Sequence, residues 1–344
     1  MNFFSIISAS ESAAESTAES IAETVAESAA SMVPEDFVFD YAMRVPILSM
    51  ILMAISLVLI IAVPVYLLVR MKNRFKFEIY ALTFGLLAYM LGVGVIPTVL
   101  ELLLSQIPSF NSFITANPTI ADLLHVALLI IFSFAGILFF LRFALRRSES
   151  AFAGAAYFGI AVGLLPILTQ GTSYLLSYLS AALSINQGQL ASSVSNMINE
   201  AMDPAEIQAG LDSMAAFIET PSYEFLFFGT DLIFQMATFL GVSLLLGLFI
   251  KAKAKTSLFK AFGVQALFCA FFAIRATGII SNNIICELIY LVVAVVAIVA
   301  ALSELNTYLP LELKKFFGKP DPKRQSSSKN EPPHKMPKIV MPKD

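Results

Sequence analysis

The chain has 344 residues, of which 58% are hydrophobic and only 14% are charged, and its mean hydropathy is +0.79. A soluble globular domain carries about 25% charged residues, so this composition excludes an ordinary soluble protein and indicates a chain embedded in lipid. The net charge of −3 conceals opposite charges at the two ends, because no Lys or Arg precedes Arg44 whereas basic residues are frequent from Lys314 onward.

The first 43 residues predict an acidic, low-complexity tail outside the cell. Glutamate recurs every four residues from Glu11 to Glu27, and alanines alternate with these glutamates. Alanine favours helix, but like charges four residues apart oppose it. A four-residue period also drifts against the 3.6 residues of a helical turn, so no fixed apolar face forms. We therefore expect residues 1–43 to be mostly disordered.

Seven apolar stretches are long enough to cross the bilayer, which requires about 20 residues each. Lys and Arg occur in alternate connections between them, and the loops 105–122, 185–223 and 281–283 contain neither. Because basic residues are retained on the cytoplasmic side, the sequence predicts an all-α polytopic helix bundle over residues 44–308, in the cell membrane, with the N-terminus outside and the C-terminus in the cytoplasm. The predicted spans cover residues 45–70, 77–104, 123–145, 151–182, 225–250, 258–280 and 284–305.

The fourth of these stretches is too long for a simple span. At 1.5 Å per residue, residues 151–182 would extend about 48 Å, whereas the hydrocarbon core is about 30 Å thick. The helix therefore either projects beyond the membrane or breaks near Pro166 and Gly171. Pro64 and Pro97 predict kinks in the first two spans as well.

The outer loop 185–223 predicts two short amphipathic helices. Apolar residues recur at helical spacing both before and after residue 203. Asp203 and Pro204 occupy the N-cap and first positions of the second helix. We expect these helices to cover the outer mouth of the bundle as packing elements; the alternative is a mobile lid or a surface for a partner.

Polar side chains occur in the outer halves of six spans, and ionisable groups inside a membrane are candidates for function because their burial is costly. Asp231 and Arg275 have opposite charges and lie at depths within about 5 Å of one another. They predict an intramembrane ion pair, whose role is either structural or functional. With Gln235 and Gln170, this pair defines a candidate pocket. Three further residues near the outer interface are secondary candidates or are simply solvated: Glu101, His125 and Glu287.

Residues 309–344 predict a basic, disordered cytoplasmic tail that is rich in Pro, Ser and Lys. Basic residues near a membrane surface are attracted to anionic lipid headgroups by about 1 kcal/mol per charge. We therefore expect the tail to contact anionic headgroups. The alternative is that these charges only keep the C-terminus on the cytoplasmic side, where Lys and Arg are retained.

The sequence has none of the common signatures of catalysis or cofactor binding. Its histidines are His125 and His334, and it has no HExxH motif and no Cys/His cluster, so we expect no metal site and no cofactor. A phosphate-binding glycine loop and a GxSxG elbow are also absent. Cys269 and Cys286 lie in apolar runs and are expected to be packing residues. From these patterns we assign no catalytic residue.

Three parts of the chain share a further pattern, in which pairs of spans are joined by basic turns. They are VPVYLLVRMKNRFKFEIYALTFGLLAYMLGVGVIPTVLELLL (63–104), AGILFFLRFALRR (135–147) with AAYFGIAVGLLPIL (155–168), and FLFFGTDLIFQMATFLGVSLLLGLFIKAKAKTSLFKAFGVQALF (225–268). Their order over residues 45–305 resembles that of a bacterial family, the YhfC-type intramembrane metalloproteases, which are related to glutamic-type membrane proteases.

The resemblance implies a catalytic motif whose residues this chain lacks. The family carries a Glu-Glu pair in its third span, and the matching residues here are Phe139 and Phe140. A His and a Glu four residues apart in its fourth span correspond to Val162 and Pro166. The resemblance therefore implies a divergent member that has lost proteolysis. Later His-bearing positions of the family correspond here to Thr230 or Asp231, and to Gln265.

These observations favour a non-catalytic pseudoenzyme that binds a membrane-protein partner or a small ligand in an outward-facing polar pocket. A transporter or permease is the first alternative, supported by the buried charge pair and the interrupted spans, although the two halves show no repeat of the kind that many transporters have. An active intramembrane peptidase that uses Asp231 or Glu101 is the second alternative, but it lacks a second positioned proton carrier. The bilayer is the predicted surrounding, and nothing indicates nucleic acid.

Overall fold

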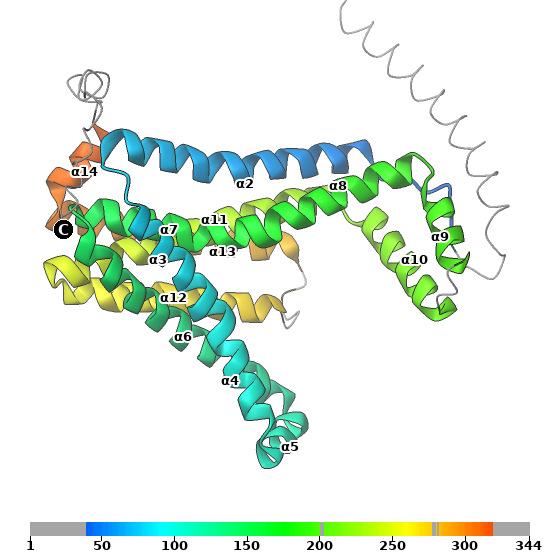
Figure 1. Ribbon diagram of the computed structural model, residues 1–344, viewed down its shortest axis with the longest axis horizontal. Coiled ribbons are helices and arrows are strands. Elements are labelled where there is room, and N and C mark those ends of the chain that lie inside the picture. Colours follow the sequence, from blue (N-terminus) through cyan, green and yellow to red (C-terminus); the bar gives the residue numbers. More distant parts are fainter. Residues whose placement is uncertain (1–38, 200–202, 277–279, 281, 319–344) are drawn as a thin grey trace, which may run out of the picture.

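The computed structural model of the protein describes residues 39–199, 203–276, 280 and 282–318, and this part of the chain is helical without β-strands (Figure 1). Seven of its helices are long and apolar enough to cross a membrane, which confirms the predicted all-α polytopic bundle. The predicted acidic repeat and residues 319–344 of the predicted basic tail lie outside the described residues.

The spans begin and end within a few residues of their predicted bounds. Five of them are single helices: α2 (Ile47–Arg74), α6 (Pro118–Arg147), α11 (Ser222–Ala252), α12 (Lys255–Ala276) and α13 (Asn283–Tyr308). The second and fourth spans each contain a π-helical turn: α3 (Ile79–Tyr89), η1 (Met90–Val95) and α4 (Ile96–Ser105), then α7 (Ala151–Pro166), η2 (Ile167–Gly171) and α8 (Thr172–Asn186). The shorter helices are α5 (Pro108–Ala116), which was not predicted, α9 (Leu190–Asn199), α10 (Pro204–Glu219) and α14 (Pro310–Phe317).

Prolines lie beside both π-helical turns. Pro97 has no N–H group to donate to the carbonyl of Val93 in η1, and Pro166 immediately precedes η2. The helix nevertheless continues through the wider turn, and the fourth span runs from Ala151 to Asn186. A break at Pro166 is therefore wrong, and Figure 1 shows the alternative, since α8 projects away from the centre of the bundle.

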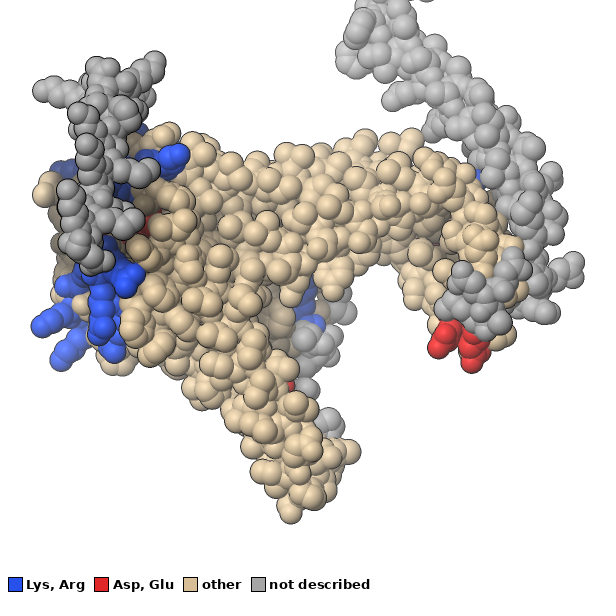
Figure 2. Space-filling model, in the orientation of Figure 1, with Lys and Arg blue, Asp and Glu red and all other residues tan. Residues whose placement is uncertain are grey.

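Lys and Arg gather at one end of the bundle, which we call the basic end. It is formed by the α2–α3, α6–α7 and α11–α12 turns together with α14. Figure 2 shows this cluster at the end opposite to the acidic side chains near α10. The same figure shows that the surface between the two ends carries few charges, as expected of a surface in contact with lipid.

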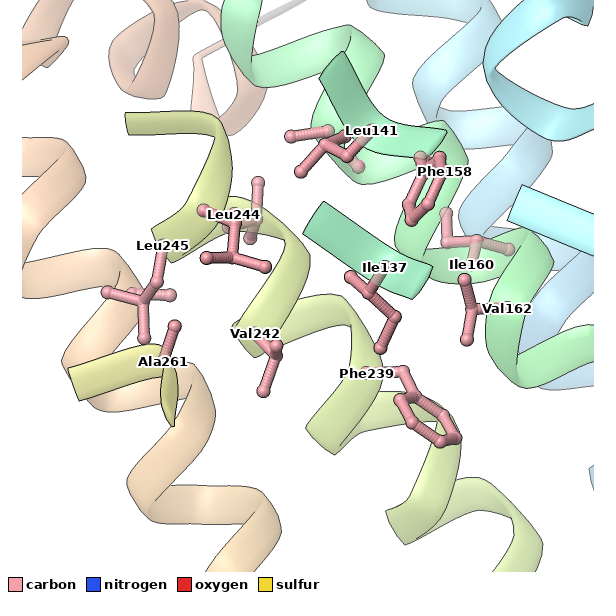
Figure 3. Packing of buried hydrophobic residues seen from close by; sticks show 14 of the residues in the cluster. Ile137, Leu141, Phe158, Ile160, Val162, Phe239, Val242, Leu244, Leu245 and Ala261 are labelled. Carbon is pink, nitrogen blue, oxygen red and sulfur yellow. The ribbon is translucent and has the colours of Figure 1, made fainter. Parts of the chain in front are cut away.

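Helix α7 and the second half of α11 form the centre of the bundle toward the basic end. Nearly every residue of α7 is buried, and its side chains pack with those of α6 and α11 (Figure 3). A Cβ atom on Gly159 would lie 2.7 Å from the Cα atom of Leu240, and one on Gly163 would lie 2.5 Å from the Cα atom of Met236. Glycines four residues apart share one helix face and let two backbones approach closely.

The loop between the fourth and fifth spans contains the two helices α9 and α10. Asp203 caps α10, because its side chain accepts a hydrogen bond from the backbone N–H of Ala205 at 2.9 Å. Ile207 and Leu211 pack against α9, whereas Ile218 packs among the ends of α2, α8 and α11. The two helices therefore pack on the end of the bundle opposite to the basic end.

The folded part of the chain extends into both predicted tails. Phe39 and Met43 belong to the segment 1–43 that we predicted to be mostly disordered. Both nevertheless pack against apolar residues of α9 or α10 and of the neighbouring helix ends. The predicted disorder of residues 309–344 is wrong for Pro310–Phe317, which forms α14. A proline at its first position and apolar contacts with the bundle account for this short helix.

Helix α14 is fixed to the start of α7 by one carboxylate. Glu312 accepts a hydrogen bond from the Ser150 hydroxyl at 2.5 Å and another from the backbone N–H of Phe152 at 2.9 Å. A carboxylate near a helix N-terminus is favourable because N–H groups of the first turn have no partner within the helix. The Phe316 and Phe152 rings, 5.3 Å apart, add an aromatic contact.

Replacing Gly163 with alanine tests the contact between α7 and α11. The added methyl group has no room beside Met236, so Gly163→Ala should destabilise the protein by about 1–3 kcal/mol. The measurement is the midpoint of thermal unfolding in detergent. Gly263→Ala in α12 is the matched control, because a Cβ there meets no described atom within 4 Å and alanine favours helix. Equal midpoints for Gly163→Ala and wild type would contradict the close approach.

Candidate functional site

A cavity of about 650 Å³ lies between the middle of the bundle and the end opposite to the basic end. The second to seventh spans all contribute to its walls, which are mostly apolar. The cavity brings together the four residues that define the predicted pocket, namely Gln170, Asp231, Gln235 and Arg275. The remaining polar or weakly polar side chains in its walls are Tyr89, Ser133, Gln265, Cys269 and Tyr290.

Asp231 and Arg275 form an ion pair across two neighbouring helices. Arg275 Nη1 donates a hydrogen bond to Asp231 Oδ2, and the side chains are 35% and 19% exposed, respectively. Helices α11 and α12 reverse direction at Lys253, whose backbone is left-handed with a φ of 55°. The two charged residues lie equally far along the chain from this turn, which places them at the same depth. The Arg275 guanidinium also lies over the Tyr290 ring, 5.5 Å from its centre.

Glu287 of α13 joins this pair, so the simple solvation that we considered for it is wrong. The Thr230 hydroxyl donates a hydrogen bond to Glu287 Oε1, and the Glu287 carboxylate interacts with both Asp231 and Arg275. Asp231 Oδ1 and Glu287 Oε2 are buried and have no hydrogen-bond partner among the described residues. Glu287 therefore lies close to Asp231, whose own partner is Arg275.

Gln265 is a cavity residue that sequence reasoning named only through the family resemblance. It is 1% exposed, and its amide nitrogen donates hydrogen bonds to Ser133 Oγ at 3.0 Å and to Cys269 Sγ at 3.5 Å. Its amide oxygen is buried without a partner in the described part of the chain. The sequence signal that could have identified Gln265 is a glutamine in the middle of an apolar span, because buried amides in membranes need partners.

Both π-helical turns face this cavity. Val93 and Gly94 from η1 and Gln170 from η2 contribute to its walls. Such turns are rare and are found frequently at functional sites, where they redirect side chains and leave backbone carbonyls less regularly paired. The prolines that perturb the second and fourth spans therefore also shape the cavity.

Glu101 and His125 form a separate pair. His125 Nδ1 lies 2.5 Å from Glu101 Oε1, and the side chains are 52% and 37% exposed, respectively. The contact joins α6 to α4, and neither residue is in the walls of the cavity. The structure thus separates these two secondary candidates from Asp231 and Glu287.

The residues that correspond to the family's catalytic motif do not form one site. Phe139 is 56% exposed, and its ring makes an edge-to-face contact with that of its neighbour Phe140. Val162 is fully buried in the packed core, and Pro166 is buried at the end of α7. None of the four residues contributes to the walls of the cavity. Of the later positions, Asp231 and Gln265 do.

Zinc, which a metalloprotease would require, does not fit the side chains at the cavity. Protein zinc sites use three or four Cys, His, Asp or Glu ligands. Across the described ranges, no three such side chains are grouped as a metal site needs. Asp231 is held by Arg275, Glu287 accepts from Thr230, and histidine is absent from the cavity walls.

Comparison with known proteins gives one family and one relative. The family model described as YhfC intramembrane metalloprotease matches residues 59–290. The chain is 27% identical over 275 residues to the uncharacterized membrane protein YhfC of Bacillus subtilis (strain 168), and the alignment covers 78% of this chain and 98% of that protein. No solved structure matches the chain.

Replacing Asp231 with asparagine tests the energetic importance of the ion pair. Asp231→Asn leaves the Arg275 charge without its partner, and we expect a loss of about 2 kcal/mol, between the small value of an exposed pair and the larger cost of breaking a buried one. Thermal unfolding in detergent measures the change. Glu149→Gln is the control, because it breaks the Lys76–Glu149 pair, whose side chains are 67% and 71% exposed. Wild-type stability for both Asp231→Asn and Arg275→Gln would contradict the pairing.

Proposed function

Because the chain belongs to the YhfC intramembrane metalloprotease family, we propose that it is a pseudoenzyme of that family, which keeps the membrane scaffold and binds a small ligand in the central cavity. The chemistry of the cavity supports this function, since its polar groups do not fit zinc. Ligand sites are commonly cavities of about 300–1,000 Å³, mostly apolar and with a few converging polar groups. The cavity described above has this size and this composition.

The proposed orientation places the basic end in the cytoplasm, because Lys and Arg are retained on that side of a membrane. The cavity then lies in the outer half of the bilayer, and the protein binds a ligand from the outside or from the outer leaflet. Lys314 and Lys315 of α14 then face the anionic headgroups of the inner leaflet.

The contact between Asp231 and Glu287 favours one other candidate function, a peptidase that works with two carboxylates. In such a peptidase, Glu287 is the second proton carrier, which the sequence analysis did not identify. In a catalytic pair of this kind, one carboxyl is protonated and the other is charged, and a water molecule is held between them. The Arg275 hydrogen bond to Asp231 Oδ2 holds Asp231 in a pair with a cation, and we therefore rank binding above hydrolysis.

Elemental analysis of the purified full-length protein tests the loss of the metalloprotease function. We expect no stoichiometric zinc, because the described side chains offer no group of three ligands. The matched blank is the final dialysis buffer. About one zinc ion per chain, reduced in the Asp231→Asn variant, would contradict the pseudoenzyme and restore a metal-dependent mechanism.

A neutral probe tests binding in the cavity. We expect one molecule of 1-naphthylmethanol to bind per wild-type chain, measured by isothermal titration calorimetry against a detergent-matched blank. Gly94→Leu should abolish this binding, because Gly94 is in the cavity wall and a Cβ there has only one described neighbour, at 4.0 Å. Gly263→Leu, at a glycine with open space elsewhere, is the control. Unchanged binding in the Gly94→Leu variant would place the ligand outside the cavity and contradict the proposed function.

A further inference from the structure

We propose that the ligand of the cavity is an organic cation, an ammonium group on an apolar body, with the charge bound at Asp231. This inference rests on the proposed binding function and adds the chemical class of the ligand. Three independent observations support it: the balance of charge, the buried atoms without partners, and the aromatic walls.

With both carboxyl groups ionised, the balance of charge beside the cavity is negative. Asp231 and Glu287 interact with one another and with one cation, Arg275. No other Lys, Arg or His is among the described residues of the cavity walls. Two carboxylates drawn together in a medium of low dielectric repel each other, and one guanidinium compensates only one of them. A second positive charge beside Asp231 would complete the balance.

The atoms that lack partners show where a ligand would bind. Asp231 Oδ1 is a buried carboxylate oxygen without a hydrogen-bond partner in the described chain, and Glu287 Oε2 is another. A buried polar group that is left unpaired is costly, and hydrogen bonds to a charged group are the strong ones. An ammonium group donates up to three hydrogen bonds and matches the two carboxylate oxygens.

The walls of the cavity fit the apolar part of such a ligand. Phe228, Phe268 and Phe272 contribute to them, together with Tyr290, over which the Arg275 guanidinium already lies. Aromatic faces attract cations, and the attraction is stronger where water is excluded. A proton shared by the two carboxylates would also balance the charge, but it would leave the aromatic cavity without a role.

Two probes of equal shape test the inference on the full-length protein. Naphthylmethylammonium and naphthylmethanol differ only in a charged ammonium in place of a hydroxyl group. We expect the ammonium to bind at least about tenfold more tightly, because charge-assisted hydrogen bonds are stronger than neutral ones. Asp231→Asn and Glu287→Gln should each reduce the ratio of the two affinities to about one, measured on variants that still unfold cooperatively in detergent. Glu219→Gln, at an exposed position of α10, is the control.

The outcomes separate this inference from the function on which it rests. If both probes bind equally, and Gly94→Leu removes both, the cavity binds ligands but has no preference for cations, and the inference is wrong. If neither probe binds, the proposed function itself fails. If sodium removes the preference for the ammonium and lithium at the same concentration does not, the site belongs to an alkali cation and the proposal is overturned. A cooperative thermal unfolding transition in detergent shows that the fold of each variant is intact.

Discussion

The approach of α7 to α11 is the contact on which the arrangement of the other helices depends. Gly159 and Gly163 remove side chains from one face of α7, and the backbone of α11 occupies the vacated space at Leu240 and Met236. In lipid, where apolar side chains gain nothing from leaving water, such close packing is a main source of helix association. The remaining spans pack around these two helices, and α11 carries Asp231 toward the opposite end of the bundle, into the wall of the cavity.

The chemistry of the cavity follows from a second constraint, the cost of charge inside a membrane. A charged side chain in a span is retained only when another charge or a hydrogen-bonding group faces it. Three helices meet this requirement together: α11 supplies Asp231, α12 supplies Arg275 and α13 supplies Glu287. In the proposed binding of an organic cation, the same contact that holds the helices together also supplies the negative charge. Stability and the proposed function thus depend on one cluster of side chains.

Much of this architecture could be predicted from the sequence, because it depends on length, hydropathy and depth. The seven spans follow from the apolar stretches, and the Asp231–Arg275 pair follows from equal depths on consecutive helices. Depth does not reveal which way a side chain points around its helix, and for this reason Glu287 was considered solvated although it faces Asp231. Phe139 illustrates the same difficulty, because a residue assigned to a motif turns out to lie on an exposed face. The order in α14 depends on Glu312 reaching the start of α7, a contact between distant parts of the chain that local composition does not contain.

The glycine contact between α7 and α11 also limits how a solute can move through the protein. Toward the basic end, the two helices and their neighbours form a continuous packed core, so the cavity is closed on that side. A molecule that entered would have to leave by the route it came, unless two backbones in direct contact were forced apart. In the proposed function, the ligand therefore enters and leaves the cavity on the same side of the membrane.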